Sequence, residues 1–421
     1  MGTNISWRAL LPAGFAVALC LCMSAAVAQE ADDWVGTWTA SPQPVWGPDF
    51  LAPPKVTRNL WNQTVRELAH VSIGGAKIRL LLSNEYTNYP ITIGSVHAAI
   101  SEKGAAIVAA TDRAVTFGGK PSITIPPGAP ALSDPIDLIV PPLSDVAVSV
   151  FVPGVTPIET MHWEGRQTAY IVAGDKTAER EIKPESTMTA KLFLSEIFVD
   201  AQPGARAVVT FGDSITDGDG STIDGNVRWP DNLARRLSDR RIAVLNQGIS
   251  GAKVLSDRMG ANALARFERD VLGQSHADIV TMMMGINDIG WPGSVLAPAD
   301  KIPTADEVIG GHQQIIARAH LHHLRIIGAT LTPFEDTFHG TPLFGYYSEE
   351  KEKVRQAVNK WIRESGAYDG VADFDAVVRD PANPKHIKAE FDSGDHLHPN
   401  DAGYIAMADS IDLGSLLGNR K

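Results

Sequence analysis

An apolar, β-branched run that stops abruptly at a serine is the feature that most constrains the fold of this chain. Residues 208–211 read Val-Val-Thr-Phe, and Gly212, Asp213 and Ser214 follow at once. Such a run is typical of a buried strand in a parallel sheet, and the polar residues after it predict a turn. Open α/β sheets bind their ligands at the carboxyl ends of their strands. The pattern therefore predicts an α/β sheet with Ser214 at its ligand-binding edge.

The C-terminal half alternates between short apolar runs and amphipathic segments. The runs predict strands at 206–211, 241–246, 279–284, 325–330 and 370–374. Helical periodicity predicts helices near 229–240, 305–323, 348–365 and 401–413. This alternation indicates a mostly parallel sheet with helices on both faces.

The N-terminal half has almost no helical periodicity from residue 31 to about 199. Segment 145–152 carries valine at every second position, and Pro- and Gly-containing turns separate the apolar runs. Many short strands at this spacing predict an all-β, antiparallel sandwich of jelly-roll type. Segment 200–205 reads as a linker. A chain of 421 residues is expected to form two domains, here a β-sandwich at 29–199 and an α/β domain at 206–421.

Residues 1–28 have the pattern of a secretory signal peptide. Arg8 precedes an apolar core at 9–23, and Ala-Val-Ala at 26–28 is a small-x-small cleavage site. The alternative, a retained membrane anchor, is disfavoured because the apolar run is short. We therefore predict a secreted or periplasmic protein. Both cysteines, Cys20 and Cys22, lie in this segment, so the mature chain is expected to have no disulfide bonds.

The mature chain is expected to be acidic. Arg8 is the only charged residue among the first 28, which leaves 36 basic against 49 acidic residues and a net charge of −13. This balance argues against nucleic acids and anionic membrane surfaces as partners.

Ser214 requires help if it is to act as a nucleophile, because a free hydroxyl is a weak one. Asp395 and His398 are three residues apart, so a single turn can hold the carboxylate against the imidazole. Pro399 restricts the backbone of His398 and helps to fix this loop. His396 fits the same role poorly, because side chains adjacent in an extended loop point apart.

Two segments can supply hydrogen-bond donors for an oxyanion. Residues 246–251 run from a strand end into a small-residue loop, where a backbone N–H can approach a ligand without an intervening Cβ. A second buried run ends at Asn287, whose side-chain amide can donate. Asn and Gly also simply terminate strands. Asp213 and Asp288, each next to a candidate residue, are interpreted as hydrogen-bond acceptors.

These blocks together resemble the SGNH, or GDSL, hydrolase superfamily. The Ser of Gly-Asp-Ser, the Gly, the Asn of Gly-x-Asn-Asp and the His of Asp-x-x-His match Ser214, Gly251, Asn287 and His398, with Asp395 completing a triad. The whole chain is similar to secreted bacterial arylesterase/acylhydrolases found beside xylan-degrading genes. The resemblance implies a five-stranded flavodoxin-like sheet, catalytic Ser214, Asp395 and His398, an oxyanion hole made by Ser214, Gly251 and Asn287, and no cofactor.

The resemblance implies a secreted serine esterase that works through an acyl-enzyme. Its expected substrates are short-chain acyl (acetyl) or aryl esters, either small or carried on a plant polysaccharide. One alternative is a lipase or lysophospholipase. An alternative of another class is a carbohydrate-binding protein with a non-catalytic scaffold, and the intact set of Ser214, Asp395 and His398 argues against it. The oligomeric state is left open.

Other chemistry-bearing residues favour ordinary structural roles. His320, His322 and His323 lack the i, i+4 spacing of helical zinc ligands and predict a solvated helix end. The acidic positions between 213 and 224 predict a polar loop at the pocket rim, and no metal site is expected. The five tryptophans of the N-terminal half are expected to fill its core or seam more readily than to stack on sugars; they are Trp34, Trp38, Trp46, Trp61 and Trp163. No chemistry is assigned to His70, His97 and His162.

Overall fold

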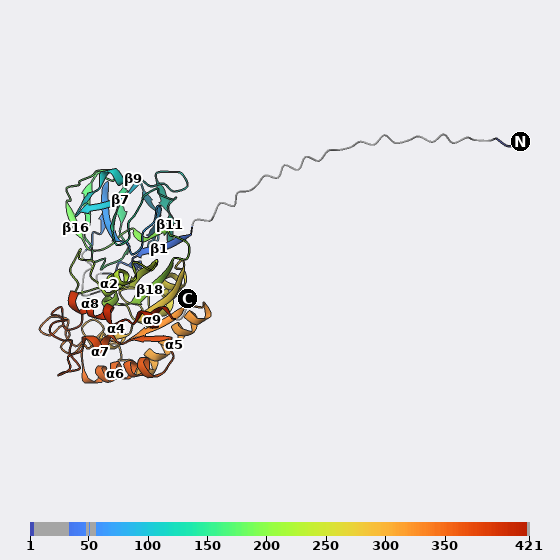
Figure 1. The fold of residues 1–421 in the computed structure, drawn as a ribbon. Helices are drawn as coiled ribbons and strands as arrows, with labels where there is room; N and C mark the ends of the chain where they lie inside the picture. Colours follow the sequence, from blue (N-terminus) through green and yellow to red (C-terminus); the bar gives the residue numbers. More distant parts are fainter. Residues whose placement is uncertain (4–32, 48–49, 51–55, 419–421) are drawn as a thin grey trace. The chain divides into compact units, whose positions relative to one another are not determined.

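The computed structural model of the protein describes residues 1–3, 33–47, 50 and 56–418 (Figure 1). The predicted cleavage site at 26–28 and both cysteines lie outside these residues. From Asp33 onward the described chain belongs to one compact unit.

The C-terminal half is built on a five-stranded sheet in which every neighbouring pair is parallel. Its strands, in spatial order, are β19 (Ile242–Gly248), β18 (Arg206–Gly212), β20 (Ala277–Met283), β21 (Arg325–Ala329) and β22 (Gly370–Ala372). In chain order this is 2-1-3-4-5, the flavodoxin-like arrangement. The predicted α/β fold with its five strands is confirmed.

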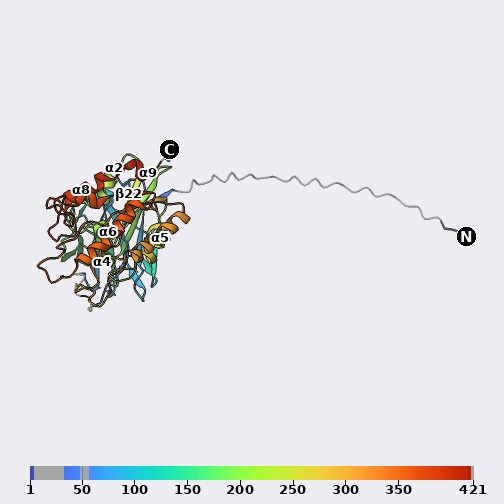
Figure 2. The same cartoon turned by 90° about the horizontal axis from the view of Figure 1, so that it is seen from below.

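Helices cover both faces of this sheet (Figure 2). They are α1 (Ser214–Asp217), α2 (Trp229–Leu237), α3 (Ala263–Phe267), α4 (Ile286–Gly290), α5 (Ala305–Leu321), α6 (Glu349–Glu364), α7 (Phe374–Val378), α8 (Asp401–Ser410) and α9 (Leu413–Leu417). A π-helical turn, Glu268–Leu272, continues α3. Val208 packs in one core with Trp229 of α2, whereas Val209 packs in the other core with Ile315 of α5. The alternation of side chains along β18 thus creates the two layers.

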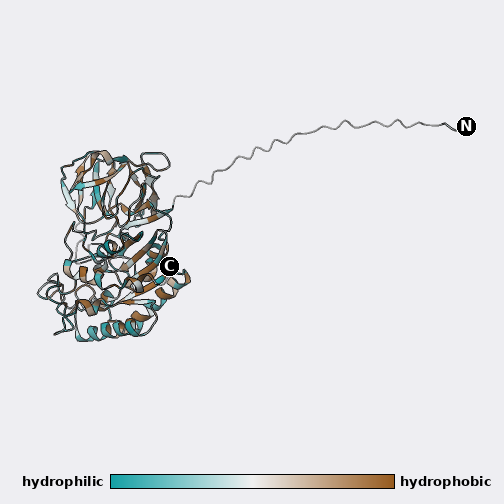
Figure 3. Cartoon of the chain, viewed as in Figure 1, coloured by the Kyte–Doolittle hydropathy of each residue, from teal (hydrophilic) through white to brown (hydrophobic). Residues whose placement is uncertain are grey.

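The four predicted helices are present with boundaries close to those expected. α5 begins at a reciprocal cap in which Thr304 and Glu307 satisfy each other's backbone N–H groups. α6 begins after Ser348, whose hydroxyl accepts a hydrogen bond from the N–H of Lys351 at 3.3 Å. Figure 3 shows α6 mostly hydrophilic and the central strands mostly hydrophobic. This is expected when a helix has one face in solvent and the sheet is buried between helices.

The N-terminal half consists of antiparallel strands. A four-stranded sheet has the order β1 (Trp34–Thr39), β17 (Leu194–Asp200), β5 (Ile78–Asn84) and β11 (Ala129–Leu132). A larger sheet has the order β16 (Ser186–Met188), β15 (Ala169–Ala173), β4 (Gln63–His70), β12 (Asp145–Val152), β7 (Ser95–Lys103) and β8 (Ala106–Ile107), and β9 (Arg113–Ala114) also pairs with β7.

Three small pairs and one short helix make up the rest of the secondary structure that the described residues of this half form. The pairs are β6 (Ile91–Ile93) with β10 (Ile123–Ile125), β3 (Asn59–Leu60) with β13 (Thr156–Pro157), and β2 (Gln43–Pro44) with β14 (Thr160–Met161). The 3₁₀ turn is η1 (Ala109–Thr111). The predicted antiparallel β structure is confirmed, while the jelly-roll connectivity stays a prediction.

The two halves of the unit share one hydrophobic core. β1 packs against β19, where Val35 and Leu245 belong to the same buried cluster. The hydroxyl of Thr39 donates to the carbonyl of Asn246 at 2.9 Å across this seam. The predicted linker begins at Asp200, the last residue of β17, and its other residues lie between β17 and β18. The division into separate domains at 29–199 and 206–421 stays a prediction.

The tryptophans of the β-rich half differ in how much of their surface is exposed. Trp38 and Trp46 are buried, as the sequence predicts, with 5% and 7% of their surface exposed. Trp61 is 68% exposed, which corrects its assignment to the core or seam. It follows the two-residue strand β3, which pairs with β13. None of the helices in the described part of the chain has the length and apolarity needed to span a bilayer.

Candidate active site

Ser214 stands where the sequence places it, at the carboxyl edge of the parallel sheet. β18 ends at Gly212, and the carboxylate of Asp213 caps α1 by accepting the N–H of Ile215 at 3.1 Å. Ser214 is therefore the first residue of α1. A Cβ at Gly212 would collide with Thr216, so this tight turn requires glycine.

The loop after β22 and α7 brings a histidine and a carboxylate to this serine. The Nε2 atom of His398 lies 2.8 Å from the hydroxyl oxygen of Ser214, and its Nδ1 lies 2.5 Å from Oδ2 of Asp395. Oδ1 of Asp395 also accepts the backbone N–H groups of Leu397 at 2.9 Å and His398 at 2.8 Å. The three-residue spacing thus forms a turn closed on its own carboxylate. The structure brings all three predicted residues into one hydrogen-bonded chain.

The charges around these three residues favour a protonated His398 in the resting state. Burial alone would lower the pKa of His398, but the nearby carboxylates of Asp395, Asp219 and Asp213 overcome it and raise the pKa to about 9. Burial opposes ionisation of Asp395 as well, yet His398 and the backbone donors hold the pKa of Asp395 well below its usual range. Asp395 therefore stays ionised and accepts a hydrogen bond from the protonated Nδ1 of His398.

Three groups that can donate hydrogen bonds belong to residues that line one cavity. Among the described residues, the backbone N–H groups of Ser214 and Gly251 have no acceptor. Gly251 has a φ of +77°, and a Cβ there would collide with Met259, so glycine is required at this position. Ser214, Gly251 and Asn287 line the same cavity.

The amide of Asn287 is held in a single orientation. Its Oδ1 accepts hydrogen bonds from Nε1 of Trp291 and from the hydroxyl of Tyr346, both at 2.8 Å. The indole N–H can only donate, so the amide oxygen must face Trp291. Nδ2 then donates to the carbonyl of Ala252 at 3.0 Å and has one N–H left for a ligand. Neither Trp291 nor Tyr346 was found from the sequence, although the spacing of Trp291, four residues after Asn287 on a helical turn, was an available signal.

The cavity beside these groups has a volume of about 120 Å³ and a mostly apolar lining. Its wall includes Phe50, Trp163, Met259, Trp291, Leu296 and Phe338. Phe50 and Trp163 come from the β-rich half, so this half reaches the candidate active site. Trp163 packs against the shared core beside Trp46, so it lies at the predicted seam, where it also forms part of the cavity wall.

The neighbouring polar residues have separate partners. Asp288 accepts the backbone N–H groups of Val254 at 2.7 Å and Leu255 at 2.9 Å, in the predicted role of an acceptor. Nδ1 of His396 lies 2.5 Å from Asp392, so His396 does not compete for Asp395.

The acidic positions between 213 and 224 do not form one polar rim. Asp219 lines the cavity, but Asp217 is 1% exposed and pairs with His162, and Asp224 accepts hydrogen bonds from Thr168. The prediction of a rim is wrong for Asp213 and Asp217, which are 0% and 1% exposed, because Asp213 caps α1 and α1 turns Asp217 inward.

The histidines at the end of α5 are exposed, as predicted, and His320 lies 3.0 Å from Asp369. Within the described ranges, no group of three or more His, Cys, Asp and Glu side chains is arranged to hold a metal ion.

The sheet order defines an open α/β domain, and Ser214, His398 and Asp395 lie together at its carboxyl edge. Residues 208–411, just under half of the chain, match the family described as GDSL-like Lipase/Acylhydrolase, so this part of the chain is similar to that family. No curated protein matches the chain.

Solved structures similar to this chain include three hydrolases. A GDSL-like lipase from Bacteroides thetaiotaomicron is 18% identical, with a TM-score of 0.37, over 50% of this chain and 87% of its own. A carbohydrate acetylesterase family member from Sinorhizobium meliloti is 18% identical, with a TM-score of 0.37, over 49% and 94%. An acetyl xylan esterase is 20% identical, with a TM-score of 0.36, over 48% and 96%.

Proposed function

We propose that this protein is a serine esterase that hydrolyses short-chain acyl, notably acetyl, or aryl esters. One observation carries the proposal: a hydrogen-bonded chain from Asp395 through His398 reaches the hydroxyl of Ser214 beside a small apolar cavity. The complete set of hydrogen bonds among Asp395, His398 and Ser214 also disfavours a purely carbohydrate-binding role. The match of residues 208–411 to the GDSL-like Lipase/Acylhydrolase family supports ester hydrolysis in general.

In the proposed reaction, neutral His398 takes the proton of Ser214 as the serine oxygen attacks the ester carbonyl. Asp395 holds the imidazole in the required tautomer and stabilises the imidazolium that forms. The N–H groups of Ser214, Gly251 and Asn287 bind the developing oxyanion. His398 then protonates the leaving alcohol. Water, activated by the same imidazole, hydrolyses the acyl-enzyme and releases the acid.

The natural substrate is proposed to be a small ester or an acylated polysaccharide. We also propose that residues 1–28 act as a signal peptide. They would direct the protein to the periplasm or to the outside of the cell.

A series of p-nitrophenyl esters of increasing acyl length tests the substrate class. We expect the highest kcat/KM for acetate or another short acyl group, because the cavity is small. A long-chain lipase would instead gain about 0.8 kcal/mol for each CH₂ that it buries. Rates are measured below the critical micelle concentration of each ester, with a heat-denatured sample as the control. A kcat/KM that keeps rising to long chains would favour the lipase alternative.

The pH dependence of kcat/KM tests the base. His398 must be neutral to accept the proton, and its pKa is raised to about 9, so kcat/KM is expected to rise with pH and to level off above about pH 9. Asp395→Asn removes the main contribution that raises this pKa, so the rise should move to lower pH while the plateau falls. The profile is measured from pH 6 to 10 and corrected for spontaneous hydrolysis. A rise that stays at the same pH in Asp395→Asn would contradict this assignment.

A further inference from the structure

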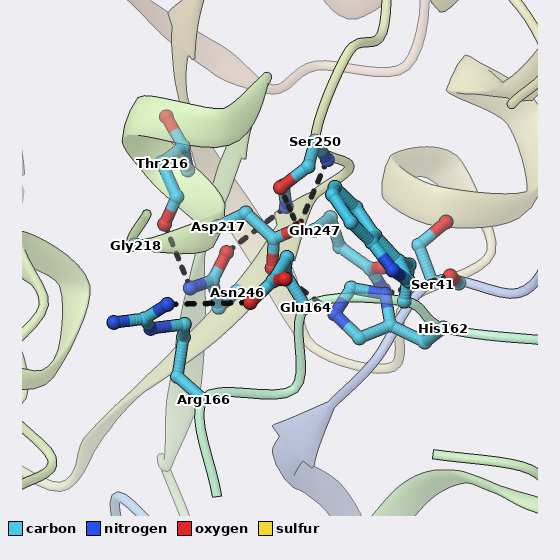
Figure 4. A network of polar contacts seen from close by, with 12 residues as sticks. Ser41, His162, Glu164, Arg166, Thr216, Asp217, Gly218, Asn246, Gln247 and Ser250 are labelled. Carbon is cyan, nitrogen blue, oxygen red and sulfur yellow. Dashed lines mark hydrogen bonds and ion pairs between the residues drawn. The ribbon is translucent and has the colours of Figure 1, made fainter. Parts of the chain in front are cut away.

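A short segment of the β-rich half, residues 162–166, contacts α1 and the loop that follows it, and through Asp217 of α1 it is linked to Ser250, next to Gly251 (Figure 4). It follows β14 directly. The backbone of His162 exchanges two hydrogen bonds with Lys191, each of 2.8 Å, which anchor the start of the segment in its own half. The segment is therefore held by the β-rich half while its side chains reach the α/β half.

The imidazole of His162 lies between two hydrogen-bond acceptors. Its Nδ1 is 3.0 Å from the carbonyl oxygen of Ser41, and its Nε2 is 3.0 Å from Oδ1 of Asp217. A carbonyl oxygen cannot donate, and an ionised carboxylate cannot either. Each ring nitrogen therefore faces an acceptor, and the imidazole is held between Ser41 and Asp217. The exposed fractions of the two side chains are 5% and 1%, so the pair is shielded from water.

The other oxygen of this carboxylate holds the loop that precedes Gly251. Oδ2 of Asp217 accepts the backbone N–H of Ser250 at 2.9 Å and its hydroxyl at 2.8 Å. The backbone N–H of Asp217 donates to the carbonyl of Asp213 at 2.8 Å, beside the nucleophile. One carboxylate thus fixes the peptide that leads to Gly251 relative to the turn that carries Ser214.

The far end of the segment is attached as well. Nη1 of Arg166 lies 3.3 Å from Glu164 and 3.5 Å from Asp219, a residue of the cavity wall. Its Nη2 donates to the carbonyl of Ser221, and its own carbonyl accepts the N–H of Asp224 at 3.0 Å. The segment therefore cannot shift without disturbing the loop after α1.

We propose that His162 is a positioning residue of the oxyanion hole, supplied by the β-rich half. Paired with Asp217, it fixes Ser250 and thereby aims the backbone N–H of Gly251 at the oxyanion. The inference rests on the proposed esterase function. The oxyanion forms only in the transition state, so loss of this positioning should lower kcat and leave KM nearly unchanged.

The test compares His162→Ala, Asp217→Ala and Asp217→Asn with the wild type. The amide of Asn can still accept from Ser250 and can donate to Nε2 of His162, so it preserves the geometry without the carboxylate charge. His97→Ala is the matched control, because His97 pairs with Asp112 at 2.9 Å in the same half, outside the cavity wall. Active sites are counted by complete labelling of Ser214 with a fluorophosphonate, and kcat for p-nitrophenyl acetate is expressed per labelled site. This normalisation removes losses caused by misfolded protein.

His162→Ala and Asp217→Ala are expected to lose roughly 10- to 100-fold in kcat per labelled site, as for a misplaced catalytic group. Asp217→Asn should recover most of that loss, and His97→Ala should match the wild type. If His162→Ala does not fold, the inference is tested by comparing kcat per labelled site between Asp217→Ala and Asp217→Asn. Wild-type kcat per site in both alanine variants, or equal losses in Asp217→Asn and Asp217→Ala, would overturn the inference alone. A wild-type protein with neither turnover nor labelling would overturn the proposed function and the inference with it.

Discussion

Ser214→Ala is expected to lower kcat for p-nitrophenyl acetate by on the order of a millionfold, the scale seen when a serine hydrolase loses its nucleophile. The reason is geometric, because the hydroxyl of Ser214 is the oxygen that lies 2.8 Å from Nε2 of His398. The purified variant is assayed beside Ser238→Ala, which removes an exposed hydroxyl that only bonds its own helix end. Thermal unfolding of both variants verifies that they are folded. Turnover like that of the wild type in Ser214→Ala would end the assignment.

Asn287→Ala is expected to lower kcat by about 10²- to 10³-fold with little change in KM, because it removes a donor used in the transition state. Tyr346→Phe provides a graded comparison. It deletes one of the two hydrogen bonds that orient the amide of Asn287 but keeps the aromatic ring, so its loss should be smaller. Steady-state kinetics with the same ester measure both variants. An unchanged kcat in Asn287→Ala would remove this side chain from the oxyanion hole.

The parallel sheet could be predicted because its strands are short apolar runs separated by helices with clear periodicity. The run at 208–211 is apolar on both faces, and the structure buries Val208 and Val209 in different cores. α3 and α4 could not be predicted in this way, since each is five residues long and too short to show a helical period. The layered arrangement of the β-rich half was harder still, because antiparallel partners are chosen by long-range packing.

The candidate triad could be predicted for two physical reasons. Asp395 and His398 are close in the chain, and the carboxyl ends of parallel strands meet at one edge of a sheet, where Ser214 also lies. The partners of the oxyanion hole follow no such rule. His162 and Tyr346 reach the site from distant segments, and a lone His or Tyr in a sequence carries no sign of the residue that it will contact.

The seam between β1 and β19 has a consequence for protein engineering. Truncation at the linker would strip the apolar cover from β19 and take Phe50 and Trp163 away from the cavity wall. The β-rich half therefore cannot be removed without changing both the core and the cavity. A library that varies only these two aromatic positions could retune substrate choice while the nucleophile, base and acid stay untouched.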